Sequence, residues 1–144
     1  MEDVHHMTCY AFTNQGSREV NEDSVAVARS PFGAFCVLAD GLGGHGMGDA
    51  ASQLVCRYLK EQFGKWQGTG MEEFLKESFE AAQVCLTLEQ VRLKAQDRMK
   101  TTAVAVVTDG KQVQWAHVGD SRLYYFKDGS LVCRTLDHSV PQRL

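Results

Sequence analysis

The sequence predicts an α+β fold, in which strands, two helices and further strands follow one another along the chain. Three observations predict it. Two short apolar stretches early in the chain flank a turn-forming sequence, and the middle of the chain carries apolar side chains at helical spacing. After Lys100 the pattern returns to short strands, two pairs of which are joined by Asp-Gly, a strong hairpin signal. Segregated strands and helices favour α+β over an alternating βαβ arrangement.

The strands are expected from their composition and from the turns between them. Ser30-Pro31-Phe32-Gly33 is typical of a turn between two paired strands, and Asp109-Gly110 and Asp128-Gly129 are expected to form hairpins within a later antiparallel meander. The expected strands are residues 7–13, 24–29, 34–39, 102–108, 113–118, 123–126 and 131–134.

Two helices are expected between the early and the late strands. Apolar residues recur every three or four positions from Met47 to Phe63, and Gly64 is expected to close that helix. Thr69 and Glu72 have the spacing of a capping box, which predicts the start of a second helix extending into the early 90s. Its apolar stripe is Met71, Leu75, Phe79, Ala82 and Leu86.

Composition limits the classes of protein to consider. The 144 residues have 44% hydrophobic and 23% charged side chains and a formal net charge of -3, as expected for one globular domain or part of one. This charge offers no general attraction to nucleic acid or to an anionic membrane. The five cysteines have no metal-ligand spacing, so we expect reduced, buried thiols in a cytoplasmic protein. The first residues lack the apolar core of a signal peptide.

The most informative feature is the carboxylate that ends an apolar stretch. Residues 35–39 are followed at once by Asp40 and then by a glycine-rich turn, Gly41-Leu42-Gly43-Gly44-His45-Gly46. A carboxylate at the end of a buried strand is costly to desolvate unless a positive group meets it. Glycines let the backbone approach a ligand closely. The pattern therefore predicts a site for a ligand or a metal.

Three interpretations of this turn differ in chemistry. The turn satisfies the dinucleotide pattern GxGxxG, but Asp40 would face a pyrophosphate without a counter-charge, and the expected second parallel strand is missing. A structural turn with Asp40 as a solvated cap does not explain so many glycines. Divalent metal binding fits better, because Asp40, the Gly41 carbonyl and Glu22 supply the oxygen ligands that Mg²⁺ and Mn²⁺ prefer. Arg18 is then placed to bind a phosphate group.

Five separated motifs occur in an order that resembles a known family. They are Arg18-Glu19-Val20-Asn21-Glu22-Asp23, Ala39-Asp40-Gly41-Leu42-Gly43-Gly44-His45, Thr101-Thr102-Ala103, Gly119-Asp120-Ser121-Arg122 and Asp137-His138-Ser139. The chain resembles the bacterial branch of the metal-dependent protein phosphatases, the PPM or protein phosphatase 2C family, over about residues 8 to 140. The resemblance implies a sandwich of two antiparallel sheets with flanking helices, of which this chain would form part.

The resemblance also implies a reaction and residue roles. A Mn²⁺- or Mg²⁺-dependent phosphatase would hydrolyse phosphoserine and phosphothreonine in proteins through a metal-bridging water. Asp40 would bridge two ions, the Gly41 carbonyl and Glu22 would contact them, and Asp120 would help to bind a third. Arg18 would hold the substrate phosphate, and Asp23 would orient water or Arg18. Thr102 is assigned to packing at a strand start, and Asp120-Ser121-Arg122 is equally compatible with a tight turn containing an ion pair.

Length is the main departure from the family pattern. The later family motifs, an Asp-Gly after an apolar strand and a final Asp-Asn, are absent from residues 1–144, which are therefore expected to be the N-terminal portion of one phosphatase domain. Alone, the chain is expected to have weak or no activity. The missing strands would leave sheet edges uncovered and favour a homodimer. The alternative function is a non-catalytic regulatory or self-associating module on the same scaffold.

Overall fold

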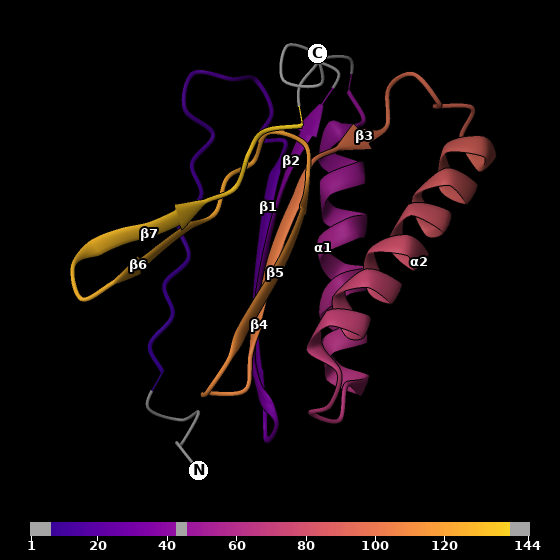
Figure 1. Cartoon of the computed structure of the whole chain (residues 1–144). Coiled ribbons are helices and arrows are strands. Elements are labelled where there is room, and N and C mark those ends of the chain that lie inside the picture. The colour runs from indigo at the N-terminus through magenta and orange to yellow at the C-terminus, as the bar shows by residue number, and fades with distance from the viewer. Residues whose placement is uncertain (1–6, 43–45, 139–144) are drawn as a thin grey trace.

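A computed structural model describes residues 7–42 and 46–138 and contains two helices that cover one face of a sheet (Figure 1). The α+β prediction is therefore confirmed. The elements are β1 (Asp23–Ser30), β2 (Gly33–Leu42), α1 (Gly48–Lys65), α2 (Met71–Arg92), β3 (Lys100–Thr101), β4 (Ala103–Thr108), β5 (Val113–Val118), β6 (Tyr124–Lys127) and β7 (Ser130–Arg134).

The strands form one larger sheet and one separate ribbon. The larger sheet has the order β1-β2-β4-β5, with the short β3 beside the end of β2, and β6 pairs only with β7. All of these pairs are antiparallel, which excludes the parallel sheet that a dinucleotide fold requires. The three expected hairpins are confirmed.

The expected continuous meander is wrong at one place, between β5 and β6. The backbone N–H of His138 donates to the Gly119 carbonyl over 2.9 Å, so the chain that returns after β7 occupies the position beside the end of β5. The β6–β7 ribbon therefore leaves the larger sheet and forms a separate two-stranded sheet, as Figure 1 shows.

The core lies between the larger sheet and the helices. Alternate residues of β2, Phe35 and Val37, are about 1% exposed and face the helices, where they meet Leu59 and Phe63 of α1. The Phe35 and Phe63 rings are stacked with their centroids 5.3 Å apart. Burial of side chains of this size contributes roughly 1.5–3 kcal/mol each, so this layer fixes which face of β2 points inward.

Two predicted helix boundaries are wrong. Gly64 lies inside α1, which ends at Lys65, because one glycine near a helix end is a small penalty against continued packing. The capping box also fails, because the N-cap of α2 is Gly70 in the left-handed region (φ 68°), with no side-chain cap. The preceding residue, Thr69, instead uses its carbonyl to accept a 2.8 Å hydrogen bond from the Trp66 indole.

The predicted strand over residues 7–13 is also wrong, since this segment is irregular. No described strand pairs with it, and Tyr10 and Phe12 are 92% and 83% exposed. A strand composition without a partner strand leaves its backbone groups to water. Figure 1 shows the segment running along the face of the sheet opposite the helices.

The cysteines are less buried than predicted. Only Cys56 is buried, whereas Cys9, Cys36, Cys85 and Cys133 are partly exposed. Cys36 illustrates the reason: it lies between the inward-facing Phe35 and Val37, so strand alternation places it on the face of the sheet that no helix covers. Neither described helix is long and apolar enough to cross a membrane.

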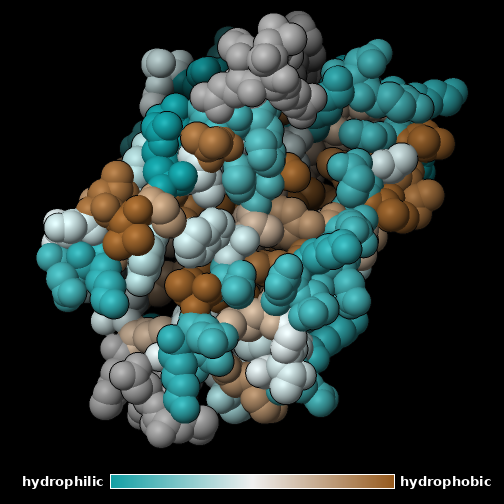
Figure 2. Space-filling view, viewed as in Figure 1, coloured by the Kyte–Doolittle hydropathy of each residue, from teal (hydrophilic) through white to brown (hydrophobic). Residues whose placement is uncertain are grey.

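Hydrophobic side chains remain at the surface of the β6–β7 ribbon (Figure 2). Phe126, Leu131 and Val132 are each more than half exposed. A hydrophobic ribbon of this kind marks a contact surface or an association liability.

Two glycines give a matched test of the packing. A Cβ at Gly33 would lie 2.1 Å from the Thr108 carbonyl oxygen, whereas a Cβ at Gly64 in α1 meets nothing within 4 Å. We expect Gly33→Ala to lower the free energy of unfolding by about 2 kcal/mol, and Gly64→Ala to raise it by about 0.5 kcal/mol. Urea denaturation followed by circular dichroism measures both. Equal effects of the two substitutions would contradict the packing of β2 on β4.

Candidate active site

Five predicted site residues come together at one end of the β1–β2 hairpin. They line a cleft of about 330 Å³ between the start of β1, the end of β2 and the preceding irregular segment. Asp23 and Asp40 are direct partners in the hairpin register, so the pairing of the strands brings their carboxylates to the same place. The predicted residues in the cleft lining are Arg18, Glu22, Asp23, Asp40 and Gly41.

The backbone of Glu22 is held by two donors. The Gly41 N–H donates to the Glu22 carbonyl over 2.9 Å, and the buried Ser52 hydroxyl of α1 donates to the same oxygen over 2.7 Å. The segment that carries Glu22 is thereby joined to the end of β2 and to the first turns of α1. Ser52 was not singled out from the sequence, where nothing distinguishes it from other helical serines.

Glycines allow β2, α1 and Glu22 to approach one another closely. A Cβ at Gly41 would lie 2.2 Å from the Gly48 carbonyl oxygen, and a Cβ at Gly48 would lie 2.1 Å from a Glu22 carboxylate oxygen. A side chain at Gly41 would therefore clash with the backbone of α1, and one at Gly48 would displace the Glu22 carboxylate. This close approach is between parts of the chain, and the approach of the glycine turn to a ligand, expected from the sequence, stays a prediction. Gly43, Gly44 and His45, the centre of the predicted glycine turn, lie outside the described residues.

The carboxylates around Asp40 disfavour its ionisation. Burial raises the pKa of Asp40 to about 6, helped by a hydrogen bond with the Asp23 side chain and by the negative charges of Asp23, Asp120 and Glu22. Oxygen ligands of one sign that converge in this way suit a hard divalent cation, which would relieve their repulsion. The donor chemistry therefore fits Mn²⁺ or Mg²⁺.

The described part of the chain does not assemble a complete metal site. Within residues 7–42 and 46–138, no three His, Cys, Asp or Glu side chains are arranged to hold one ion. The cleft residues therefore suit a divalent cation in the type of ligand and in the convergence of negative charge, and further ligands would be needed to complete the coordination of an ion.

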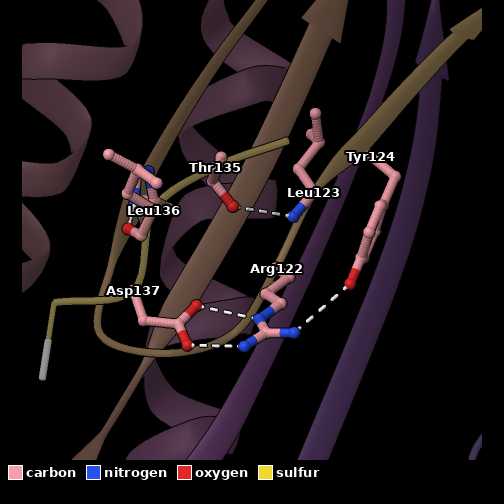
Figure 3. Close-up of polar contacts among 7 residues, drawn as sticks. Arg122, Leu123, Tyr124, Thr135, Leu136 and Asp137 are labelled. Carbon is pink, nitrogen blue, oxygen red and sulfur yellow. Dashed lines mark hydrogen bonds and ion pairs between the residues drawn. The ribbon is translucent and has the colours of Figure 1, made fainter. Parts of the chain in front are cut away.

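Asp120 lies near the cleft but not in its lining. It is exposed in the turn after β5, and its charge acts on Asp40. Arg122 of this turn forms an ion pair with Asp137, which lies outside the turn, with Nε–Oδ1 and Nη2–Oδ2 distances of 2.9 and 2.8 Å (Figure 3). This two-pronged contact lowers the pKa of the Asp137 carboxyl and ties the two ends of the β6–β7 ribbon together.

Arg18 reaches the cleft from a small loop. The Gln15 side chain donates to the carbonyls of Arg18 and Glu19 over 2.6 and 2.8 Å, which holds the loop backbone. Arg18 itself is exposed and lines the cleft together with the carboxylates. An arginine beside a cluster of metal-type ligands is the arrangement that would bind a phosphate group.

Thr102 has a larger role than the packing assigned to it from the sequence. Its hydroxyl accepts from the Asp40 N–H over 3.1 Å and lies 2.5 Å from the Ser121 hydroxyl, while its own N–H donates to the Asp40 carbonyl over 2.9 Å. Thr102 is only 3% exposed. It therefore links the backbone of Asp40 to the turn that carries Asp120. No feature of the sequence distinguishes such a threonine from one that only packs.

Comparison with models of protein families shows to which family the chain is related. The model of the family described as protein phosphatase 2C matches residues 13–139. The chain belongs to the protein phosphatase 2C family. This confirms the resemblance drawn from the five motifs, since the match spans all of them.

Bacterial phosphatases are among the similar proteins. Serine/threonine protein phosphatase PstP of Mycobacterium tuberculosis is 34% identical over 128 residues, which cover 88% of this chain and 24% of that protein. Serine/threonine phosphatase stp of Listeria welshimeri is 32% identical over 132 residues, covering 88% and 52%. This protein phosphatase 2C chain thus spans at most about half the length of these relatives.

Solved structures agree with the fold. A bacterial serine phosphatase matches with a TM-score of 0.79 and 29% identity, over 92% of this chain and 56% of that one. The catalytic domain of PstP in complex with two manganese ions matches with a TM-score of 0.73 and 30% identity, over 88% and 53%. The backbone of this family member is therefore that of about half of a bacterial phosphatase domain.

The raised pKa of Asp40 predicts a pH-dependent stability in metal-free buffer. Asp40 ionises near its ordinary pKa of 3.8 in the unfolded chain and near 6 in the folded chain. The folded state therefore binds the Asp40 proton more tightly, which stabilises it fully below pH 4, and this contribution to the free energy of unfolding is lost as the pH rises through 6. We expect Asp40→Asn to raise the free energy of unfolding at pH 7 by about 1 kcal/mol, allowing for solvent screening, and to flatten its pH dependence between 4 and 6. Denaturant titrations across this range, with a chelator present, measure it. An unchanged pH profile in the variant would show that Asp40 ionises normally.

The link through Thr102 predicts a loss of stability when its hydroxyl is removed. Thr102→Val keeps the shape of the side chain but leaves the Asp40 N–H and the Ser121 hydroxyl without this partner, so we expect a loss of about 1–3 kcal/mol. The control is Thr101→Val, because the Thr101 hydroxyl donates only to the neighbouring Thr102 carbonyl among the described contacts. Thr102→Ser should retain most of the stability. If Thr102→Val lowered the free energy of unfolding no more than Thr101→Val does, the Thr102 hydroxyl would not stabilise the site as we infer.

Proposed function

We propose that this chain is the N-terminal part of the catalytic domain of a divalent-metal-dependent phosphatase that acts on phosphoserine and phosphothreonine in proteins. One observation carries the proposal. In a member of the protein phosphatase 2C family, an arginine and a group of acidic side chains line a single cleft, where burial and the neighbouring acidic groups raise the pKa of Asp40 to about 6. Phosphoryl transfer depends mainly on positioning and on neutralising charge, and this cleft offers groups for both.

Each residue is given a role that matches its position. Asp40 and the Gly41 carbonyl would hold two cations, Glu22 would contact one of them, and Asp120 would help to hold a third from its neighbouring turn. Arg18 would bind two phosphate oxygens through its planar guanidinium group. Two manganese ions are named in the related PstP structure, which supports Mn²⁺ as the first choice, with Mg²⁺ as the other hard cation of this chemistry.

Protonation of the chain's own groups sets the conditions for this activity. Asp40 would bind a cation as the carboxylate, so protons compete with the cation at this group, and its raised pKa of about 6 strengthens that competition as the pH falls. Asp23, paired with Asp40 across the hairpin, is placed to orient water or Arg18. Bound divalent cations would supply a water nucleophile of lowered pKa and would neutralise the phosphate charge.

We further propose that this chain alone is weakly active or inactive. The chain covers about half of the related phosphatase structures, and the described residues hold an incomplete set of metal ligands. The proposed cytoplasmic location rests on the cysteine pattern of the sequence.

A second candidate is a non-catalytic, self-associating module. It is favoured by the exposed hydrophobic side chains of the β6–β7 ribbon and by the two outer strands of the larger sheet, β1 and β5. These surfaces could pair two copies of the chain into a homodimer.

One set of experiments tests both candidates. We expect calorimetry to show weak Mn²⁺ binding by the 144-residue chain and to show its loss in Asp40→Asn, because that change removes the proposed bridging carboxylate. Asp128→Asn is the matched control, since it makes the same charge change in the β6–β7 turn, where asparagine tolerates the positive φ of 51°.

Hydrolysis of p-nitrophenyl phosphate by the 144-residue chain should be slow, with and without Mn²⁺. In any residual activity, Arg18→Lys should raise KM, because lysine lacks the planar group that binds two phosphate oxygens.

The outcomes separate the proposals. Mn²⁺ binding that survives Asp40→Asn would overturn the assigned site, and fast Mn²⁺-dependent turnover would overturn the proposed weakness of the partial chain. A stable dimer by light scattering, with neither Mn²⁺ binding nor turnover, would favour the self-associating module.

A further inference from the structure

Two cysteines that are distant in sequence meet on the face of the sheet that no helix covers. The sulfur atoms of Cys9 and Cys36 lie 3.2 Å apart, although 27 positions separate the two residues. Cys36 is in the middle of β2, paired with Val27 of β1 on one side and Val106 of β4 on the other. Cys9 belongs to the irregular segment that follows this face. Neither thiol is a part of the proposed phosphatase site.

We propose that Cys9 and Cys36 are a redox modification site that a hydroperoxide converts into an intramolecular disulfide. The sulfurs are already in contact, so bond formation requires an approach of about an ångström to the usual S–S length near 2 Å. Cys36 is held by strand pairing on both sides, whereas Cys9 lies in a segment without regular backbone hydrogen bonding, which can supply that movement.

The chemistry takes two balanced steps. A thiol attacks the hydroperoxide, the O–O bond breaks, and one sulfur becomes a sulfenic acid while water (or an alcohol) leaves. The second sulfur then attacks the first, the S–O bond breaks, and hydroxide leaves with the second thiol's proton as water. Two electrons pass from the thiols to one hydroperoxide. We assign the first attack to Cys9, because burial and the neighbouring Cys9 raise the pKa of the Cys36 thiol to about 12.

Oxidation would tether the segment that carries Arg18. The few described contacts between its first residues and the sheet include a hydrogen bond from the Arg29 guanidinium to the Met7 carbonyl and the Cys9–Cys36 contact. A disulfide would close a loop over residues 9–36 that contains Arg18, and Cys36 lies four positions before Asp40 on the same strand. The modification therefore limits how far the Arg18 loop can move from the carboxylates.

The remaining cysteines serve as internal controls. Cys56 is buried, and burial raises the pKa of its thiol to about 11. Cys85 of α2 and Cys133 of β7 are partly exposed, like Cys9 and Cys36, but the described contacts place neither against another cysteine. Exposure alone therefore does not select the reactive pair.

Mass spectrometry of the oxidised chain tests the proposal. After treatment with hydrogen peroxide, we expect the intact mass to fall by two hydrogen atoms and the free thiols to fall from five to three. Tryptic digestion should link the peptide that ends at Arg18 to the peptide of residues 30–57, with fragmentation placing the bond at Cys36 and not at Cys56. The melting temperature should rise by about 5 °C, and trypsin should cleave more slowly after Arg18.

Matched variants separate the cross-link from general oxidation. Cys9→Ser and Cys36→Ala should lose the cross-link and the rise in melting temperature, whereas Cys85→Ser and Cys133→Ser should keep both. Reduced samples of each variant must first melt like the reduced wild-type chain, and Cys9→Ser, in the exposed segment, is the one expected to do so most closely. A full count of thiols after peroxide, or a bond between any other two cysteines, would overturn the proposal.

Discussion

The register of the β1–β2 hairpin is the constraint on which the site depends. Phe35 and Val37 must face the helices, and strand alternation then places Asp40 on the opposite face beside Asp23. A slip of one residue would turn the hydrophobic side chains outward and would direct Asp40 into the helical layer. The burial that stabilises the fold and the placement of the acidic cleft are therefore set by one hydrophobic pattern.

This arrangement places repelling groups together in the folded state. Asp40, Asp23 and Glu22 converge, and burial together with the contact and negative charge of these neighbours raises the pKa of Asp40. The surrounding structure compensates through neutral contacts: two donors hold the Glu22 carbonyl, and Thr102 is bonded to both backbone groups of Asp40. Repulsion that persists because neighbouring packing enforces it is typical of functional sites.

Much of the fold and of the candidate site could be predicted from the sequence, because the signals are local. Turn sequences such as Asp-Gly, together with short apolar stretches, identified the hairpins. The apolar strand ending in Asp40 and the Arg18–Asp23 motif identified the residues that line the cleft. The failures involve partners distant in sequence. Residues 7–13 have strand composition but no described strand to pair with, and Thr102 acts through residues about 20 and 60 positions away. Such contacts leave no periodic trace in a single sequence.

The face of the sheet opposite the helices connects these observations. It carries Cys36 and borders the cleft, and the irregular first segment follows it. That segment is anchored by few contacts, yet it delivers Arg18 to the carboxylates. A loosely held segment is drawn from the least stable part of a fold, so its position responds to small energies. Any contact made on this face, whether a disulfide at Cys9 or strands packed from another polypeptide, would therefore restrict Arg18 more than it would alter the rigid pair of Asp23 and Asp40.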